Sequence, residues 1–285
     1  MPKKRPRSSI PLVPPPMKSR KLARKITTKF HKLNTLLSST ETSQEELERV
    51  GKEMEEMGGR ARYQEASQLS TKHFSTSKWV IGRIQSLGLL RGVEIGSKEG
   101  DDGQSDDIRP TNLLEIGAIN TDLLSLNSQK SANVNVRAID LRSSVEGVET
   151  MDYMQFPEDQ HFDVIVNSMV INSVPSALLR GQMLLKMFRQ LNLGGVLFLM
   201  LPLLCLNSSK YLTKEGFVRM LLDVGFEEVL RKETPKIFFI VLRRPQSAPS
   251  SLPPMSKATE KKKKTPNLVV VNKGKKFRGD FGVIF

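Results

Sequence analysis

The stretch "NLLEIGAIN", residues 112–120, predicts the architecture of the middle of the chain. Its apolar run ends in Glu-Ile-Gly, as a buried strand does before it enters a nucleotide-binding loop. Such loops usually carry two or three glycines, whereas here Gly117 is followed by Ala118 and Ile119. The stretch is therefore either a cofactor loop with few glycines or an ordinary strand end.

Strand-like and helix-like segments alternate after this stretch. Further apolar runs are expected to form buried strands at "NVRAID" (135–140), "FDVIV" (162–166) and "VLFLML" (196–201). Two amphipathic segments should form helices capped by Ser176 and Thr213, and Gly194-Gly195 should end the first of them. The last two runs, "EEVLRKE" (227–233) and "KIFFIVLRR" (236–244), lie so close together that they should pair antiparallel. The pattern predicts an α/β fold whose sheet is mostly parallel, with an antiparallel last strand.

The rest of the chain divides around this α/β domain, which we expect to cover residues 109–245. Residues 1–25 are rich in Pro, Lys and Arg without periodicity, so we expect a disordered basic tail. Residues 26–108 hold helical periodicities and should form a helical N-terminal extension. Because "SKWVIGRIQSLGLL" (77–90) is too short to hold its own core, we expect the N-terminal helices to pack on the sheet and not to form a separate module. Residues 246–285 are expected to be a basic C-terminal tail.

The basic charge is concentrated in the two tails. The formal net charge is +14, and residues 1–25 hold nine Lys or Arg and no acid. Residues 250–285 hold nine more against two acids, so the middle of the chain is close to neutral. This distribution favours binding to a polyanion or a nuclear address, and "KKRPR" (3–7) has the composition of a nuclear localisation patch. The C-terminal "EKKKKTPNLVVVNKGKKFRGDF" (260–281) either grips phosphates while "NLVVVN" adds an edge strand, or is a disordered tail.

Several classes of protein and site are disfavoured by the composition. Cys205 is the only cysteine, so no intrachain disulfide forms, and the three histidines, His31, His73 and His161, are too scattered for a zinc cluster. No secretory signal is visible, and the most apolar run, from Gly194, is too short to span a bilayer. We expect an intracellular, soluble protein without a metal or a membrane partner.

Acidic residues lie where parallel strands end. In an open α/β sheet, ligands bind beyond the carboxyl ends of the strands, and Glu115 and Gly117 end the first strand there. Asp140 ends the next strand, where an acid can accept two ribose hydroxyls. The strand order resembles that of Rossmann-like class I methyltransferases, in which the position of Asp152 reaches the adenine amino group. Ala118 covers backbone N–H groups that a pyrophosphate would need, so the loop favours S-adenosylmethionine, which has no phosphate.

The residues after the third long strand bear on the methyl acceptor. Asn167-Ser168 stands where methyltransferases acting on exocyclic amino groups carry an Asn/Asp-Pro-Pro-aromatic box. Because that box is missing, methylation of an exocyclic amine is disfavoured. Asn167 is the candidate catalytic residue, and it either hydrogen-bonds a base edge or caps a turn. Cys205 is interpreted as a buried structural residue and not as a covalent nucleophile.

The chain as a whole resembles the fungal adenine-N(1) methyltransferases of 25S ribosomal RNA. The matching pieces are "LLEIGAIN", "AIDLRS", "MDYMQFP", "FDVIVNSMVINSVP", "RGQML", "LFLMLPLLCLNSSKYLT" and "KKFRGDFGVIF". The resemblance implies a Rossmann-like fold, S-adenosylmethionine as methyl donor, and adenine N(1) in large-subunit ribosomal RNA as acceptor. It also implies a nucleolar address in the nucleus and work on pre-ribosomal particles, and it gives Gly117 and Asp140 the cofactor-contact role.

Two other functions remain compatible with the sequence. Animal relatives of the fold are sensors of S-adenosylmethionine, so the chain is alternatively a non-catalytic sensor that acts through a protein partner. A third hypothesis is a ribosome-assembly factor whose tails bind RNA and whose fold is a relic. For an enzyme, adenine N(1) must be unpaired or flipped out, and aromatic side chains would support the base. Tyr153, Phe156 and Tyr211 are either such stacking residues or core residues.

Overall fold

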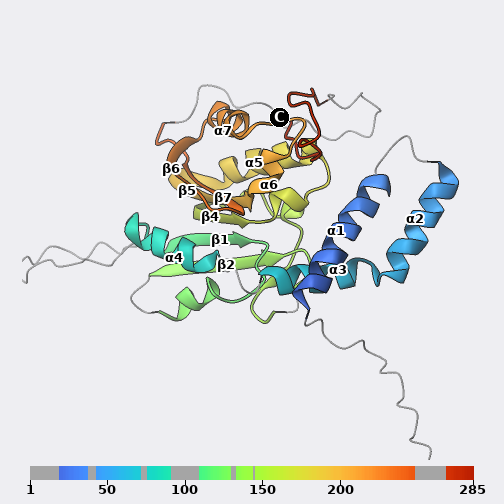
Figure 1. Ribbon diagram of the computed structural model, residues 1–285. Helices are drawn as coiled ribbons and strands as arrows, with labels where there is room; N and C mark the ends of the chain where they lie inside the picture. Colours follow the sequence, from blue (N-terminus) through green and yellow to red (C-terminus); the bar gives the residue numbers. More distant parts are fainter. Residues whose placement is uncertain are drawn as a thin grey trace, which may run out of the picture. The chain divides into compact units, whose positions relative to one another are not determined.

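The computed structural model describes residues 19–37, 43–71, 76–90, 109–129, 133–143, 145–247 and 268–285. These residues belong to two compact units, divided between Ser75 and Thr76 (Figure 1). The predicted nuclear localisation patch at 3–7 and the lysine run at 261–264 lie outside the described residues. Each unit is treated separately below.

The first unit consists of three helices, α1 (Arg20–Leu37), α2 (Gln44–Glu56) and α3 (Gly59–Thr71). α1 and α3 pack through Ala23 and Ala66, which are fully buried, and the ring of Phe30 stacks on Tyr63 with 4.2 Å between centroids. α1 begins at Arg20, so the helix includes residues expected to lie in the disordered basic tail. The first unit therefore has a small core of its own, and packing around this core stabilises the three helices.

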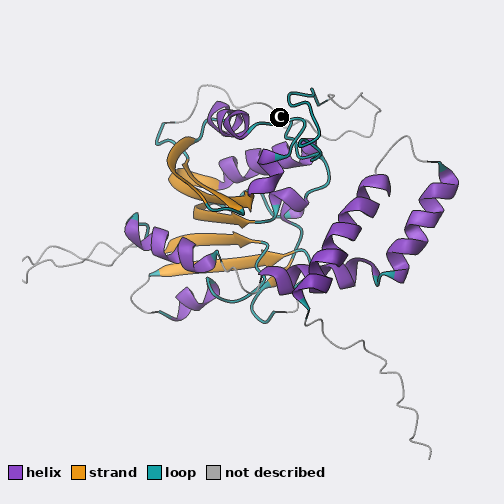
Figure 2. Ribbon diagram, in the orientation of Figure 1, coloured by secondary structure: helices purple, strands orange, loops and turns teal. Residues whose placement is uncertain are grey.

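The second unit contains a seven-stranded sheet in the order β3-β2-β1-β4-β5-β7-β6 (Figure 2). Its strands are β1 (Thr111–Ile116), β2 (Val134–Asp140), β3 (Glu149–Thr150), β4 (Phe162–Ser168), β5 (Leu191–Pro202), β6 (Glu227–Glu233) and β7 (Ile237–Arg243). The pairs among β1 to β5 are parallel, whereas β7 runs antiparallel to both β5 and β6. The predicted Rossmann-like α/β fold with an antiparallel last strand is confirmed.

Helices cover both faces of this sheet (Figure 1). The α-helices of this unit are α4 (Ser77–Ser86), α5 (Ala177–Gln190), α6 (Leu203–Asn207) and α7 (Lys214–Asp223). Three short 3₁₀ helices lie in connections to the strands: η1 (Leu124–Ser128) between β1 and β2, η2 (Tyr153–Gln155) between β3 and β4, and η3 (Ile171–Ser173) between β4 and α5. The predicted caps of α5 and α7 are confirmed, because Ser176 Oγ accepts the N–H of Leu179 and Thr213 Oγ1 accepts that of Gly216.

Alternating side chains of the central strands build two separate cores. In β5, Leu197 and Leu199 pack under α5 and α7, while Val196 and Phe198 face α4 and η1. This is the period of two that a strand imposes when both of its faces are buried. The continuous apolar runs seen in the sequence therefore arise from burial on both sides.

Among the helices of the N-terminal extension, α4 packs on the sheet, as expected, whereas α1, α2 and α3 belong to the first unit. Val80 and Ile84 of α4 are fully buried, and the Trp79 ring lies 4.7 Å from that of Phe239 in β7. The hydroxyl groups of Thr76 and Ser168 are 2.7 Å apart, which joins the start of α4 to the end of β4. α4 thus belongs to the sheet unit.

The predicted end of α5 at Gly194-Gly195 was wrong. The helix stops at Gln190, and β5 begins at the next residue. Gly194 has φ +75°, and the ladder between β4 and β5 is irregular before Val164. The glycine pair therefore shapes a distorted strand start, which the sequence pattern cannot distinguish from a helix stop.

Residues 268–285 fold back onto the second unit (Figure 1). No helix or strand forms among these residues, and the described part of "NLVVVN" does not add an edge strand. Phe281 and Val283 are nevertheless buried in the core beside α5. Neither interpretation drawn from the sequence, an edge strand or a disordered tail, describes this packed but irregular segment.

Candidate functional site

The carboxyl ends of β1, β2 and β4 meet at one edge of the sheet. Ile116, the last residue of β1, is paired with Ile139 in β2 and with Asn167 in β4. Gly117 and Asp140 follow directly on these paired positions. The sequence-predicted residues at the ends of these strands are therefore brought together, although their contacts with a ligand stay a prediction.

The loop after β1 has no backbone donors for a phosphate in its first two residues. The N–H groups of Gly117 and Ala118 both donate to the carbonyl of Ile139, at 2.8 and 3.0 Å. The next helical element is η1, which has only five residues and so offers no long helix dipole. These contacts answer the question raised by the single glycine, because a pyrophosphate would find neither feature here.

Gly117 is needed for the packing of this edge. Its φ is +79°, a conformation that residues with side chains rarely adopt. A Cβ atom at this position would overlap Cγ2 of Val170, which lies in the connection between β4 and α5. The missing side chain therefore lets that connection close against the loop, in addition to any approach by a ligand.

Glu115 is a buried carboxyl group with an unsatisfied oxygen. The residue is 7% exposed, and its Oε2 atom is buried without a hydrogen-bond partner. Burial, with a contribution from Asp122, raises the pKa of Glu115 from 4.5 to about 8. A buried acceptor without a donor is costly in a folded protein, and a cationic ligand group at this edge would supply the donor.

Asp140 and Asp152 occupy half-buried positions near the same edge. Asp140 Oδ1 accepts the N–H of Arg142 at 2.8 Å, and no donor among the described residues reaches Oδ2. Burial raises the pKa of Asp140 above its usual value, although the hydrogen bond from Arg142 acts against it. Asp152 Oδ1 accepts the N–H of Met154 at 2.9 Å and so begins the turn η2. Each carboxylate is held by a local backbone bond, which fixes its orientation.

Asn167 lies inside the core. It is fully buried, its Oδ1 accepts the N–H of Ile171 at 3.4 Å, and its Nδ2 lies 3.7 and 3.6 Å from the sulfur atoms of Met183 and Met187. These contacts fit the interpretation as a turn residue, because they hold η3 against β4. A direct contact with a base stays a prediction.

The other candidate side chains are also mostly core residues. Tyr153 and Phe156 are 3% and 1% exposed, and Tyr153 donates its hydroxyl to Gln190 at 2.6 Å. Tyr211 is half-buried and is the remaining stacking candidate of the three. Burial raises the pKa of Cys205 to about 11, so its thiol stays protonated at neutral pH, as a structural cysteine does.

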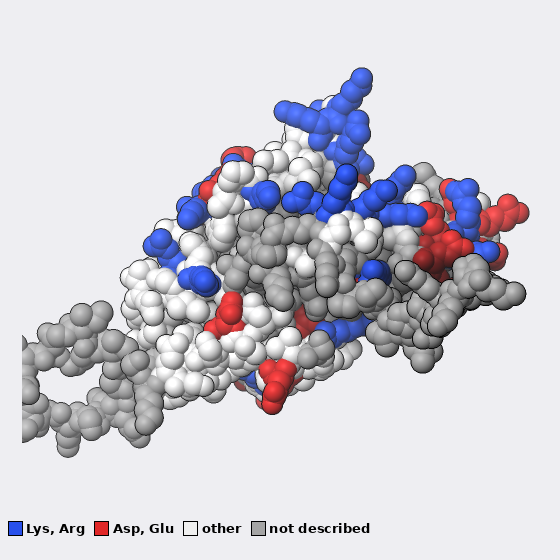
Figure 3. Space-filling view, turned by 60° about the horizontal axis from the view of Figure 1, so that its bottom comes forward, with Lys and Arg blue, Asp and Glu red and all other residues white. Residues whose placement is uncertain are grey.

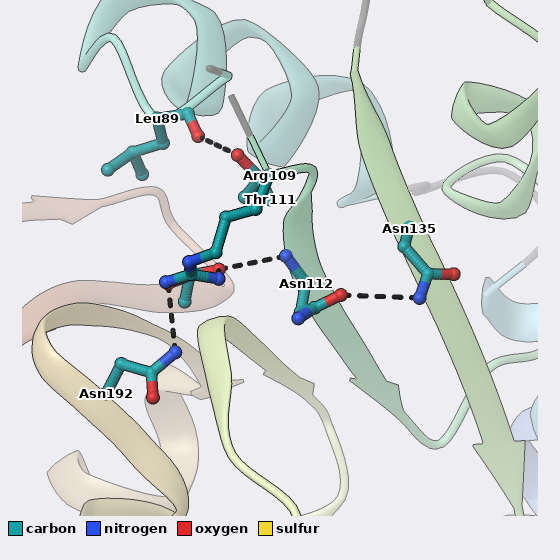
Figure 4. A network of polar contacts seen from close by, with 7 residues as sticks. Leu89, Arg109, Thr111, Asn112, Asn135 and Asn192 are labelled. Carbon is teal, nitrogen blue, oxygen red and sulfur yellow. Dashed lines mark hydrogen bonds and ion pairs between the residues drawn. The ribbon is translucent and has the colours of Figure 1, made fainter. Parts of the chain in front are cut away.

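A polar network at the opposite edge was missed by the sequence analysis (Figure 4). Both terminal nitrogens of Arg109 donate to Asp163, at 2.8 and 2.9 Å, and the N–H of Asn112 and Nδ2 of Asn192 donate to the same carboxylate. Burial acts to raise the pKa of Asp163, but these bonds outweigh it and lower the pKa. The only sequence signal was an acid inside the apolar run "FDVIV". The network joins β1, β4 and β5 at their amino ends and therefore acts as a structural clamp.

An open hollow of about 310 Å³ lies beside this clamp, lined by Asn112, Asn135, Arg137, Gln160, His161 and Phe162. Arg137 is already bound to Glu149 and Gln160 there. The hollow is at the amino edge, away from the strand ends that carry Glu115 and Asp140, so we assign no ligand to it. Across the described ranges, there is no cluster of metal-ligating side chains and no helix long and apolar enough to cross a membrane.

Comparisons with known proteins support the family suggested by the sequence. The chain is 28% identical over 180 residues to the 25S rRNA (adenine(2142)-N(1))-methyltransferase of Saccharomyces cerevisiae, an alignment that covers 56% of this chain and 53% of the yeast protein. The chain thus spans about half the length of this curated relative.

Two solved structures also align with the fold. An O-methyltransferase family protein from Burkholderia thailandensis has a TM-score of 0.49 at 12% identity, over 80% of this chain and 72% of that one. The N-methyltransferase NodS from Bradyrhizobium japonicum, in complex with S-adenosyl-L-homocysteine, has a TM-score of 0.35 at 17% identity, over 47% of this chain and 78% of that one.

The decisive match is to a family profile. It covers residues 48–272, which include most of α2, the whole sheet and every residue discussed at its carboxyl edge. A match over so much of the chain establishes membership. The chain belongs to the family described as 25S rRNA (adenine(2142)-N(1))-methyltransferase, Bmt2.

Proposed function

We propose that this protein transfers a methyl group from S-adenosylmethionine to N(1) of an adenine in large-subunit ribosomal RNA. The observation that carries the proposal is the family match over residues 48–272, which contains both the sheet and the edge with Glu115 and Asp140.

The residues at the carboxyl edge fit this cofactor. The unpaired Oε2 of Glu115 suits a cationic donor such as the cofactor's ammonium group. The free oxygen of Asp140, at the end of the neighbouring strand, suits a ribose hydroxyl. The N–H groups of Gly117 and Ala118 are occupied by Ile139, which suits a cofactor without phosphates. When bound, S-adenosylmethionine supplies an electrophilic methyl group.

The chemistry asks little of the protein beyond placement. Adenine N(1) has its own lone pair, so no protein nucleophile is required. The protonated thiol of Cys205 is therefore compatible with the reaction. Holding the base in line with the methyl group at near-contact distance can supply most of the rate. Asn167 contributes indirectly, because its amide fixes η3 at the end of β4. N(1) lies on the Watson–Crick edge, so the target adenine must be unpaired or flipped out.

The proposed partners and location follow from the proposed substrate. We place the protein on pre-ribosomal particles in the nucleolus, supported by the basic sequence of residues 3–7 and by the net charge of +14. Deleting residues 1–18 and imaging a tagged protein tests this, with loss of nucleolar signal expected and unchanged localisation contradicting it.

The function is tested with purified protein, S-adenosylmethionine carrying a labelled methyl group, and an unmodified large-subunit rRNA transcript. Labelled RNA is expected, with a reverse-transcriptase stop next to the modified adenine. Asp140→Ala should abolish transfer, whereas Asp159→Ala, a change at an exposed acid in the β3–β4 connection, should not. Cofactor binding without transfer would indicate the sensor, and absence of both would indicate the assembly factor with a relic fold.

A further inference from the structure

We propose that residues 272–285, here called the basic strap, form the surface that docks the phosphate backbone of the RNA beside the methyl-transfer edge. The proposal rests on the proposed function for the identity of the RNA. The exposed charged side chains of this segment contribute neither to the core nor to the expected cofactor site. Anchorage, charge and position each support it.

The basic strap is anchored to the second unit by buried contacts. Phe281 and Val283 are 6% and 5% exposed, and the carbonyl of Phe281 accepts the hydroxyl of Ser209. The N–H of Ile284 donates to the carbonyl of Ala177, at the start of α5. Because its apolar side chains pack in the core, the backbone of the segment is held in place. The positions from which its charged side chains extend are therefore fixed.

Arg180 ties the basic strap to the connection between β4 and α5. Its guanidinium is buried, donates to the carbonyls of Gly282 and Val174 at 2.8 and 2.9 Å, and lies 4.8 Å from the ring centre of Phe281. The same connection carries Val170, which packs against Gly117. The basic strap therefore lies at the carboxyl edge of the sheet, on the side of the strands where the cofactor site is expected.

The outward side of the basic strap is positively charged. Its four exposed cations are Lys273, Lys275, Lys276 and Arg278, and none of them forms an ion pair with a described residue. The strap's one acid, Asp280, is occupied by Lys210 at 3.0 Å. Figure 3 shows lysine and arginine side chains gathered and projecting along the upper part of the view.

A polyanion is the partner that this surface fits. Unpaired, exposed cations attract phosphates and release counterions when they bind them. Half-buried Phe277, with Lys276 Nζ at 4.9 Å from its ring centre, adds an aromatic face on which a base can stack. Contacts of this kind position an RNA without reading its sequence. An RNA strand held here would have its neighbouring nucleotides at the edge that carries Asp140.

The test is a variant in which all four cations are changed to Gln. Its binding to a short unrelated single-stranded RNA and to large-subunit rRNA is measured over a range of salt concentrations. Loss of four phosphate contacts should make the log–log salt slope shallower by about 3 and weaken low-salt binding by about tenfold or more for both RNAs. A matched control changes four exposed cations elsewhere on the second unit, Lys78, Arg219, Lys232 and Arg243, to Gln.

The outcomes separate this inference from the proposed function. Equal losses of RNA affinity in the strap variant and in the control would refute the basic strap as the docking surface, and so would unchanged affinity in both. Either conclusion holds whether or not the protein transfers a methyl group. If the wild type transfers no methyl group but the strap variant alone loses RNA binding, the docking surface stands and the enzyme does not. Calorimetry with S-adenosylmethionine should give the same affinity for the strap variant and the wild type.

Discussion

Replacing Glu115 by Gln should change how the stability of the protein depends on pH. The wild-type carboxyl group keeps its proton in the folded chain up to about pH 8, whereas in the unfolded chain it loses the proton near pH 4.5. Between these values the folded state binds more protons than the unfolded state. The free energy of unfolding of the wild type therefore falls as pH rises through this window, and levels off above it. The Gln side chain does not titrate, so its contribution to the free energy of unfolding does not change with pH.

The size of the effect follows from the two pKa values. Each unit of pKa corresponds to about 1.4 kcal/mol, so a rise from 4.5 to about 8 corresponds to a limit of about 5 kcal/mol. Between pH 5 and pH 9, the free energy of unfolding of the wild type should fall by about 4 kcal/mol relative to Glu115→Gln. Contributions from all other titrating groups are common to the two proteins and cancel in this difference.

Urea denaturation of both proteins at several pH values measures this difference. Glu227→Gln is the matched control, because Glu227 is exposed at the start of β6, and its curve should run parallel to that of the wild type. If the free energies of unfolding of Glu115→Gln and the wild type depend on pH in the same way, the inference that the Glu115 carboxyl is buried and unpaired is refuted. Bound S-adenosylmethionine should remove much of the pH dependence in the wild type alone, because its ammonium group favours the ionised form of Glu115.

Three further changes test other parts of the structure by urea denaturation. Gly117→Ala should destabilise the fold by about 2 kcal/mol or more through overlap with Val170 and the positive φ, and Val170→Ala in the same chain should recover the part due to overlap. Asp163→Asn should lower the free energy of unfolding by about 1–3 kcal/mol near neutral pH. This loss should shrink as the pH falls below 3.8 and then through the lowered pKa of Asp163 in the folded wild type. Phe281→Ala should lose about 3–5 kcal/mol, because the side chain is 6% exposed in the core.

Each of these predictions has an outcome that contradicts it. Additive effects of the two changes at Gly117 and Val170 would show that their side chains do not meet. An Asp163→Asn curve parallel to the wild type at acid pH would exclude a stabilising charge on that carboxylate. Wild-type stability of Phe281→Ala would mean that residues 272–285 do not complete the core.

Much of the fold was predictable because burial leaves a periodic signal. Apolar runs in β1, β4 and β5 identified strands buried on both faces, and Ser176 and Thr213 marked helix starts through the caps that they form. The start of β5 was not predictable, since two glycines mark a distorted strand as readily as the end of a helix. The irregular strap gave no periodic signal, because tertiary contacts alone hold it.

The candidate site divides in the same way. The positions of Glu115, Gly117 and Asp140 followed from strand ends, which sequence can locate. The burial of Asn167 and Phe156 depends on where α5 and η2 pack, which is a tertiary property. The clamp around Asp163 joins residues up to 54 positions apart and has no local pattern at all.

The position of β7 between β5 and β6 has a consequence for how the sheet assembles. β6 and β7 are joined by only a short turn, so this hairpin can form from local contacts. Only β7 then touches the rest of the sheet, through a seven-residue antiparallel ladder with β5. The hairpin must therefore dock as a unit, and β6, whose side chains are mostly exposed, gains no second neighbour when it does. Backbone amides of β6 should accordingly exchange with deuterium well before those of β5, which lies between two partners.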